Sequence, residues 1–563
     1  MMRHFIGKLT FVLGCAACTA LPARAQTTNH NFEVMKHLDI FNQLYRELDL
    51  FYVDTLSAKK NIGNAINYML EMIDPYTEYY AAENTNDLKQ MTTGKYAGIG
   101  SVISYRDELK RCIIEKPYEG NPAADAGLLP GDIILAIDGK DIPTCDSKDL
   151  EKRAEYSNSV STGVRGEAGT TLELKVRRPT NNRTYTFKVT RRSILIPSVA
   201  LATVLSDSIG YIKITQFIEG TSNEVRRAMV DLKQQGARSL ILDLRNNPGG
   251  VLEEAVKTVN LFIPRGREVV NMKGKVKEAN QTYKTVLDPQ DPDIPLIVLT
   301  NEQSASSSEI TAGALQDYDR ALIVGRRTYG KGLVQQSREL AYKGALKLTV
   351  GKYYIPSGRC VQAYEFRDGM PVHRPDSLSR EFRTANGRIV RDGGGIKPDV
   401  EIKSDSLPNL LAYMDASTQL FDFCVNYCAK HPKIAQPEDF SISDDEYADF
   451  CEFMKKHKFT YDRQSLRVLE TLKTFARFEG YDTEARAEIE ALEKKLKHNE
   501  DYDFKRWKPE IKKVLEAAIV ERYYFDAGRY RYLLRTDKEV QQAVKLMRNT
   551  KAMLKTLSGE PEA

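Results

Sequence analysis

The chain has 563 residues, of which 42% are hydrophobic and 28% are charged, and its formal net charge at pH 7 is +5. This composition is typical of a soluble globular protein with several domains. The modest net charge gives no indication of a nucleic-acid partner, which would require a clustered basic face or a binding motif.

The first residues are typical of a secretory signal peptide. Basic residues precede an apolar stretch from Leu9 to Leu21, and Ala23-Arg24-Ala25 provides an A-x-A cleavage site. We therefore expect residues 1–25 to be removed and the protein to be exported, to the periplasm or elsewhere in the cell envelope. The apolar stretch is too short for a transmembrane span of about 20 residues, and we expect none in the mature chain. The segment Val12–Cys15 loosely resembles a lipoprotein cleavage site, so a lipid-anchored form is the alternative.

The cysteines do not predict a disulfide scaffold or a metal site. An oxidising compartment permits disulfides, but a chain of this size can build ordinary cores without them. The sequence does not combine paired cysteine or histidine partners at the spacing of a complete zinc site, so we expect no metal. Six cysteines remain after the predicted signal peptide: Cys112, Cys145, Cys360, Cys424, Cys428 and Cys451.

A small β module follows an N-terminal helical region, which we place at residues 26–92. The module, at residues 93–192, contains the stretch Asn121–Gly139, which includes a glycine turn into an alternating strand and a hairpin signal. This stretch resembles a PDZ domain. Upstream, the loop Gly98-Ile99-Gly100 resembles the row of exposed amides that captures a terminal carboxylate in such domains. A glycine-rich β domain without a ligand is the alternative interpretation.

A glycine turn follows the next predicted strand. The apolar run Ser239–Leu244 predicts a buried strand, Arg245–Gly250 forms the turn, and Val251–Leu261 predicts a helix. Glycines permit positive φ and close backbone approach, so Gly249 or Gly250 would leave an N–H group free to meet developing negative charge. An ordinary connection between sheet and helix is the alternative.

A serine-rich turn provides the strongest candidate for a nucleophile. The apolar run Pro295–Thr300 predicts a strand, Ser304–Glu309 follows it, and Ile310–Gln316 predicts a helix. Ser306 would then lie at a strand-to-helix turn near exposed N–H groups, which suits the stabilisation of an oxyanion. A serine-rich loop that serves only turn formation is the alternative.

A lysine after another predicted strand is the candidate base. Ala321–Val324 is a short apolar run, and Lys331 follows between two glycines. A neutral lysine can activate a serine hydroxyl, but its ordinary pKa of about 10.4 must fall by several units, so we expect a desolvated site. A solvated loop lysine is the alternative. The same stretch nearly spells a phosphate-binding P-loop, but Gly332 stands where serine or threonine would hold Mg²⁺, which argues against an NTPase.

Five sequence blocks occur in the order that is typical of one family. The chain resembles the carboxyl-terminal processing peptidases, also called tail-specific proteases, whose pattern runs DLRNNPGG, SASASE, GKGxxQ, YYxPSGR and GGIxPD. Agreement in order is more specific than any single block. The corresponding blocks in this chain are Asp243–Gly250, Ser304–Glu309, Gly330–Gln335, Tyr353–Arg359 and Gly394–Asp399.

The resemblance implies a role for each matching residue. Ser306 would be the nucleophile, Lys331 the general base and Gln335 the residue that orients the lysine. Ser307 replaces the usual alanine after the nucleophile, but its backbone N–H remains available for the oxyanion, with Gly249 or Gly250 as the second donor. No metal or cofactor is implied.

The resemblance also implies a fold and a substrate class. We expect a multidomain α/β protein with a ClpP/crotonase-like serine peptidase core at residues 193–404, an inserted and mostly β PDZ domain, and helical N- and C-terminal regions. A carboxylate-binding module beside an endopeptidase would select unfolded proteins or exposed C-termini. A catalytically silent PDZ scaffold that binds C-termini is the alternative function.

The C-terminal region, residues 405–563, lies beyond the resemblance. Its long charged amphipathic patterns predict a helical domain. Such a domain is interpreted as a structural extension or as an oligomerisation or adaptor surface. An apolar face in the N-terminal helices suggests a homodimer.

Overall fold

The computed structural model describes residues 22–403, 407–496 and 500–559. It divides into two compact units, one comprising Met1–Tyr79 with Asp368–Met370 and the other comprising Tyr80–Arg367 with Pro371–Ala563. Most of the predicted signal peptide lies outside the described residues.

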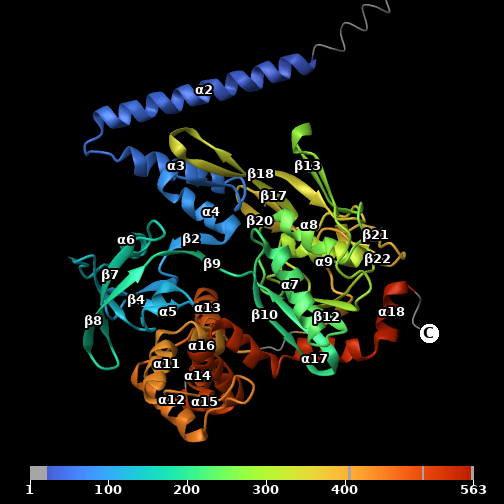
Figure 1. The fold of residues 1–563 in the computed structure, drawn as a ribbon. Helices are drawn as coiled ribbons and strands as arrows, with labels where there is room; N and C mark the ends of the chain where they lie inside the picture. The colour runs from blue at the N-terminus through green and yellow to red at the C-terminus, as the bar shows by residue number, and fades with distance from the viewer. Residues whose placement is uncertain (1–21, 404–406, 497–499, 560–563) are drawn as a thin grey trace, which may run out of the picture. The chain divides into compact units, whose positions relative to one another are not determined.

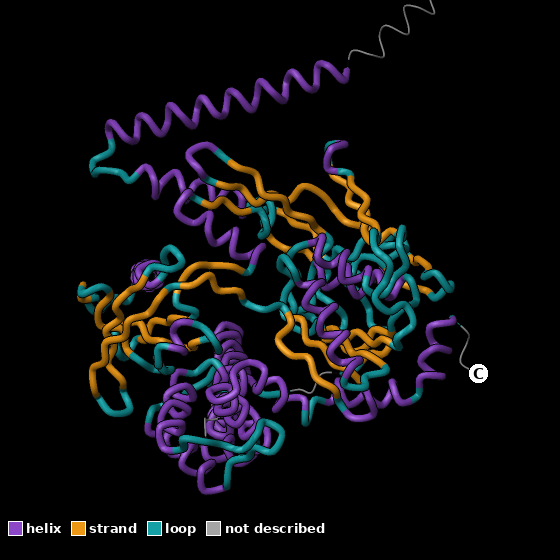
Figure 2. The backbone as a smooth tube through the Cα atoms, in the orientation of Figure 1, coloured by secondary structure: helices purple, strands orange, loops and turns teal. Residues whose placement is uncertain are grey.

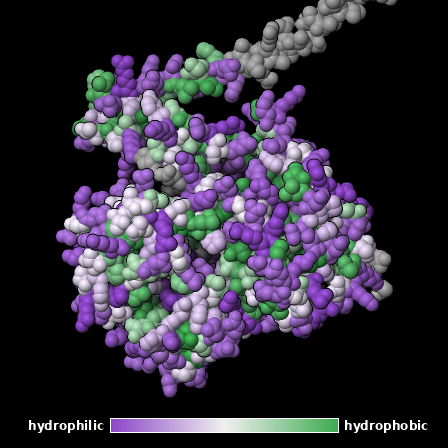
Figure 3. Space-filling model, viewed as in Figure 1, coloured by the Kyte–Doolittle hydropathy of each residue, from purple (hydrophilic) through white to green (hydrophobic). Residues whose placement is uncertain are grey.

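The first unit contains the predicted N-terminal helices α2 (Pro22–Phe51) and α3 (Ala58–Glu71). Helix α3 begins at Ser57, whose hydroxyl accepts the N–H of Lys60. Many apolar side chains of α2 are exposed, and apolar patches along this helix are visible in Figure 3. Among the described residues, no helix combines the length and the apolar character needed to cross a membrane.

The second unit begins with a short helical segment and the predicted β module (Figure 1). The core of this module, which includes Ile114, Leu128 and Leu174, is fully buried. The hairpin signal Asp138-Gly139 is a turn in which both residues have positive φ, as predicted. One sheet has the strand order β3-β4-β5-β7-β8, β6 pairs with β5, and β2 pairs with β9. The elements are η1 (Ala82–Asn84), α4 (Thr85–Thr93), β2 (Lys95–Gly98), β3 (Ser101–Arg106), β4 (Arg111–Pro117), α5 (Pro122–Asp125), β5 (Ile133–Ile137), β6 (Lys140–Asp141), α6 (Leu150–Val164), β7 (Thr171–Arg178), β8 (Arg183–Thr190) and β9 (Arg192–Leu195).

A six-stranded sheet forms the α/β core, in the order β10-β11-β12-β15-β16-β23. Strands β10 and β11 are antiparallel, and the other neighbours are parallel. Each of the three predicted strands is present and lies in the middle of this sheet. The elements are β10 (Val199–Val204), β11 (Ile209–Ile214), α7 (Thr221–Gln234), β12 (Ser239–Asp243), α8 (Leu252–Asn260), β15 (Leu296–Thr300), α9 (Ser307–Asp317), β16 (Leu322–Gly325) and β23 (Val400–Glu401).

Both faces of this sheet are covered by helices. Leu240 and Leu242 pack with α7, α8 and α9, whereas Ile241 points to the opposite face. That second face packs against Val540 and Met547 of α17 (Lys538–Arg548) and against residues of α18 (Thr550–Ser558). The sequence predicted a separate helical C-terminal region and did not predict that its last helices would cover the sheet.

A second antiparallel sheet carries the strand that follows Lys331. Strand β17 pairs with β18, and β18 pairs with β13, which pairs with β14. The segment after Gly332 is therefore a strand and not the helix that follows a P-loop. The elements are β13 (Glu268–Gly274), β14 (Gln281–Lys284), β17 (Leu333–Glu339) and β18 (Ala345–Tyr354). Short strands and turns make up the rest: β1 (Glu78–Tyr80), β19 (Tyr364–Arg367), β20 (Met370–His373), β21 (Glu381–Arg383), β22 (Ile389–Arg391), η2 (Ser206–Ser208), η3 (Lys277–Ala279), η4 (Ala341–Lys343) and η5 (Asp376–Leu378).

The described part of the C-terminal region is helical, as predicted, and is drawn in Figure 2 as helices joined by loops. Its own core contains Cys424, Phe450 and Leu515, which are fully buried. Cys424 and Cys428 both lie on α11. The helices before α17 are α10 (Asn409–Asp415), α11 (Thr418–Lys430), α12 (Asp444–Lys456), α13 (Gln464–Glu479), α14 (Arg486–Leu496), α15 (Glu500–Arg506) and α16 (Lys508–Leu534).

Candidate active site

Three loops that carry the candidate residues leave the same edge of the central sheet. They follow β12, β15 and β16, which are neighbouring parallel strands. The carboxyl ends of parallel strands meet at one edge, which is where ligands bind in open α/β sheets. The predicted glycine turn, serine turn and lysine segment therefore lie close together.

Ser306 occupies a strained turn at the start of α9. Its φ is +53°, a value in the left-handed region that non-glycine residues rarely adopt. The side chain is half-buried. Tyr353, which is fully buried, donates its hydroxyl to the Ser306 carbonyl oxygen at 3.3 Å. The backbone at Ser306 is thus held in an uncommon conformation by its surroundings.

A single buried carboxylate, Glu309, binds both candidate catalytic segments. Its Oε2 accepts the backbone N–H of Ser306 at 2.9 Å and that of Lys331 at 2.8 Å. Its Oε1 accepts the N–H of Gly330 at 2.7 Å and the hydroxyl of Thr328 at 2.6 Å. Burial raises the pKa of Glu309, while these hydrogen bonds favour its charged form.

This arrangement fixes the distance between the nucleophile and lysine backbones. Because the amides of Ser306 and Lys331 donate to one oxygen atom, their nitrogens lie within two hydrogen-bond lengths of each other. Lys331 is half-buried. No role was predicted for Glu309, although Ser306-x-x-Glu309 has the spacing of a capping box, a pattern that indicates the contact with the Ser306 amide.

The glycine turn lies directly against the nucleophile. Gly249 has φ +97°, and a Cβ atom built on it would lie 2.8 Å from the Cβ of Ser306 and 2.9 Å from the nitrogen of Ser307. Gly250 has φ +139°, and its Cβ would lie 2.0 Å from the carbonyl oxygen of Phe217. Both positions therefore require glycine, for conformation and for space.

The two glycine amides point in different directions. The N–H of Gly249 donates to Oδ1 of Asn247 at 2.9 Å. The carbonyl oxygen of Gly249 accepts the N–H of Phe217 at 2.9 Å, so in the trans peptide that follows, the N–H of Gly250 points away from Phe217. The hydroxyl of Ser307 donates to the carbonyl oxygen of Gly250 at 2.9 Å, and this contact connects the glycine turn to α9.

Gln335 lies on β17, where its side-chain amide donates to the hydroxyl of Thr349 on β18 at 3.1 Å. This contact fixes the glutamine across the hairpin. The predicted role of Gln335 in orienting Lys331 stays a prediction.

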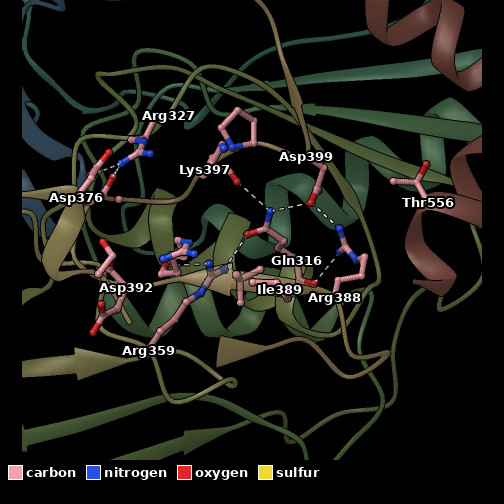
Figure 4. A pocket seen from close by; sticks show the side chains of 16 residues that line it. Gln316, Arg327, Arg359, Asp376, Arg388, Ile389, Asp392, Lys397, Asp399 and Thr556 are labelled. Carbon is pink, nitrogen blue, oxygen red and sulfur yellow. Dashed lines mark hydrogen bonds and ion pairs between the residues drawn. The ribbon is translucent and has the colours of Figure 1, made fainter. Parts of the chain in front are cut away.

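The two remaining family-like blocks support α9, and the first of them also provides Tyr353, which contacts the Ser306 carbonyl oxygen. Arg359 is 1% exposed, and its Nη2 donates to Asp317 at 2.8 Å and to Gln316 at 2.7 Å. The amide of Gln316 in turn donates to Asp399 at 2.9 Å. Figure 4 shows Gln316, Arg359 and Asp399 in a pocket of about 590 Å³ whose charged groups point toward one another. Ser306 and Lys331 do not line this pocket.

The predicted carboxylate loop borders a groove in the β module. A pocket of about 220 Å³ is lined by Ile99, by Ser101 of β3, by Val164 of α6 and by Arg165, for which no role was predicted. The guanidinium of Arg165 lies 5.7 Å from the ring centre of Tyr96, at the same pocket. The groove thus combines apolar walls with one cation.

The six cysteines of the described chain are free, and no cluster of histidine, cysteine or carboxylate side chains suited to a metal occurs among the described residues. Burial raises the pKa of Cys112 to about 11 and that of Cys424 to about 12.

Comparison with known families gives three matches. Residues 208–371 match the model described as "Peptidase family S41", residues 113–178 match "PDZ domain", and residues 410–547 match "Probable PDZ-protease, C-terminal helical domain". The matches fall on the α/β core, the β module and the helical C-terminal region.

Proteins that are similar to this chain have names that agree with these families. The "Carboxy-terminal-processing protease" of Bartonella bacilliformis is 34% identical over 371 residues, covering 65% of this chain and 82% of the relative. A "Probable CtpA-like serine protease" of Staphylococcus epidermidis is 34% identical over 399 residues, covering 70% of this chain and 77% of the relative. The solved structure titled "Photosystem II D1 C-terminal processing protease" is 27% identical and covers 65% of this chain and 87% of that one, with a TM-score of 0.34.

Proposed function

The chain belongs to the carboxy-terminal-processing serine proteases of peptidase family S41 and carries a PDZ domain, and from this premise we propose that Ser306 and Lys331 form its catalytic dyad. The observation that carries the proposal is the Glu309 carboxylate, which binds the backbone amides of both residues. A buried charge at this position is costly unless it is fully hydrogen-bonded, so its presence is best explained by the need to hold the two segments together.

The reaction is hydrolysis of a peptide bond through an acyl-enzyme. The Oγ of Ser306 attacks the carbonyl carbon, and its proton moves to the neutral Nζ of Lys331. When the tetrahedral intermediate collapses, the C–N bond breaks and Lys331 returns the proton to the leaving amine. Water then attacks the ester carbonyl, with Lys331 again as base, and Ser306 leaves as the free hydroxyl. Gln335 assists by orienting the lysine.

The oxyanion is bound by the N–H groups of Gly250 and Ser307. The amide of Gly249 already donates to Asn247, whereas the amide of Gly250 points away from Phe217. Ser307 lies in the first turn of α9, where backbone N–H groups have no acceptor within the helix. Two donors beside the nucleophile stabilise the charge that develops on the carbonyl oxygen.

The PDZ groove captures the free C-terminus of an unfolded or extended substrate. The amides of Gly98, Ile99 and Gly100 bind the terminal carboxylate, and Arg165 contributes a positive charge at the same pocket. Cleavage then occurs near that end of the substrate.

The chain is proposed to work outside the cytoplasm, in the periplasm or cell envelope, because residues 1–25 have the pattern of a signal peptide. The exposed apolar side chains of α2 are suited to a homodimer interface. Contact with an adaptor protein is proposed for the helical C-terminal region.

Cleavage of an unfolded protein with an apolar free C-terminus tests the proposal. The purified chain is compared with Ser306→Ala and Lys331→Ala, and both variants are expected to lose cleavage while they still bind the C-terminal peptide. If the parent chain and both variants bind the peptide equally and none cleaves, the silent scaffold is the better account. Continued cleavage by either variant would show that the site is assigned wrongly.

A further inference from the structure

A buried ionic network lies behind the three catalytic loops. Lys213 of β11 donates to Asp243 at 3.0 Å, and Tyr211 donates its hydroxyl to the same carboxylate at 2.7 Å. Arg245, two residues beyond the end of β12, pairs with Asp243 as well. Burial raises the pKa of Asp243, but the charges of Arg245 and Lys213 outweigh that effect and hold it below the usual range.

The network is completed from the C-terminal region. Asp537 caps α17 by accepting the N–H groups of Glu539 and Val540, and its carboxylate also lies 2.8 Å from Nη2 of Arg245. Glu539, in the first turn of the helix, pairs with Nη1 of Arg245 at 2.5 Å. Two carboxylates at a helix N-terminus are favoured by the helix dipole.

Glu539 also reaches the other two catalytic loops. Its second oxygen pairs with Arg326, which directly follows β16 on the way to Lys331. The Nε of Arg326 donates to Glu302 at 2.7 Å, and Glu302 belongs to the turn that leads to Ser306. The glycine turn, the serine turn and the lysine segment are thus connected through one side chain that is 10% exposed.

We propose that Glu539 is a positioning residue for catalysis: by bridging Arg245 and Arg326 it holds the oxyanion loop, the nucleophile loop and the lysine segment in register. The inference depends on the proposed function, because it assigns a role relative to Ser306 and Lys331. It gives the helical C-terminal region a part in the chemistry, since the shared carboxylate comes from α17 and not from the peptidase core.

The charge balance makes a selective test feasible. In Glu539→Gln, Arg245 keeps Asp243 and Asp537, and Arg326 keeps Glu302, so no cation is left without a partner. The side-chain oxygen of the new glutamine can accept a hydrogen bond from one arginine, but its NH₂ group faces the other. The bridge between Arg245 and Arg326 therefore opens. A displacement of about 1 Å in a catalytic loop lowers the rate by up to about 100-fold.

The matched control is Asp503→Asn. Asp503 is a buried carboxylate of α15 that pairs with Arg463 and accepts the hydroxyl of Tyr461, entirely within the helical region. It has the same kind of partners as Glu539 but no contact with a catalytic loop in the described chain.

The experiment measures kcat and KM for a peptide substrate, together with the melting temperature, for the full chain and its variants. Glu539→Gln is expected to lower kcat by about tenfold or more with KM within about twofold, Glu539→Asp to recover part of kcat, and Asp503→Asn to keep kcat. If Glu539→Gln fails to fold, Glu302→Gln opens the outer link of the same network, between Arg326 and the serine turn, and is expected to lower kcat by about threefold or more.

Two results would overturn the proposal. One is an unchanged kcat in folded Glu539→Gln, or in Glu302→Gln where that variant replaces it. The other is an equal loss of kcat in Glu539→Gln and Asp503→Asn that follows their melting temperatures, which is the signature of a purely structural role. Ser306→Ala, assayed beside them, separates this failure from that of the proposed function, because residual cleavage in that variant would refute the dyad itself.

Discussion

Replacing Glu309 with glutamine tests whether one carboxylate aligns the nucleophile and the lysine. Each carboxylate oxygen accepts two hydrogen bonds, one pair from Gly330 and Thr328 and the other from Ser306 and Lys331. A glutamine presents an NH₂ group to one of these pairs. The orientation with the smaller cost directs NH₂ at Gly330 and Thr328, because a threonine hydroxyl can also accept a hydrogen bond.

The expected loss of stability in Glu309→Gln follows from the hydrogen bonds that are lost in that orientation. The N–H of Gly330 loses a charged acceptor in a buried site, which costs about 1.5 to 3 kcal/mol, and the bonds from Ser306 and Lys331 weaken because their acceptor becomes neutral. Removal of a buried charge offsets part of this loss. We expect the free energy of unfolding to fall by about 2 to 3 kcal/mol. Since the lysine segment shifts, kcat is expected to fall by up to about 100-fold.

The assay compares chemical denaturation and peptide cleavage in Glu309→Gln and in Glu516→Gln. Glu516 is also buried and accepts hydrogen bonds from Ser441, Ile442 and Tyr532, but it lies in the helical region. The control should lose a similar amount of stability and keep its kcat per folded molecule. If folded Glu309→Gln cleaves at the wild-type rate, the carboxylate does not align the two segments and the reasoning fails.

Three further predictions concern glycine, pH and thiols. Gly249→Ala should lower kcat by about 100-fold or more because the new Cβ atom meets Ser306. The control is Gly236→Ala, at φ +94° with no atom within 4 Å of the new Cβ, which should lower stability alone. Kinetics and melting temperatures of both variants test this, and equal kcat values would contradict the contact with Ser306. Burial raises the pKa of Glu309 above its ordinary 4.5, so the folded state binds the proton more tightly and the stability from this group falls as pH rises from 4.5 through the folded pKa. Chemical denaturation at increasing pH from 4.5 should therefore show that the difference in free energy of unfolding between the wild type and Glu309→Gln narrows. A difference that widens with pH would refute the upward direction of the pKa shift. Burial raises the pKa of Cys112 to about 11 and that of Cys424 to about 12, so both thiols should resist a thiol reagent at pH 8 until the chain is denatured. Mass spectrometry measures the labelling, and rapid labelling of either thiol in the native protein would contradict its burial.

The sequence predicted the parts of the site that depend on local pattern. The strands before Gly249, Ser306 and Lys331 are continuous apolar runs, and parallel strands buried on both faces have that pattern. The family resemblance, which rested on five ordered blocks, is confirmed by the matches to peptidase family S41 and to a PDZ domain.

Other contacts could not be predicted because they join residues far apart in the chain. Glu539 and Arg245 are separated by most of the core and the helical region, and neither residue type has a local pattern that specifies its partner. The amphipathic pattern of α17 predicted a helix with one buried face, but periodicity does not indicate which surface covers that face. The proposal of Gly250 rather than Gly249 as an oxyanion donor likewise rests on hydrogen bonds of Asn247 and Phe217, which appear only in three dimensions.

Helices α17 and α18 pack on the second face of the central sheet, and their position in the sequence determines when that face is buried during synthesis. Both helices follow every other described element in the sequence, so they are synthesised after the strands they protect. Until they emerge, Ile241 and its neighbours on that face lack their partners, and Arg245 lacks Glu539. The described part of the central sheet therefore gains both of its helical layers only after α17 and α18 have been synthesised.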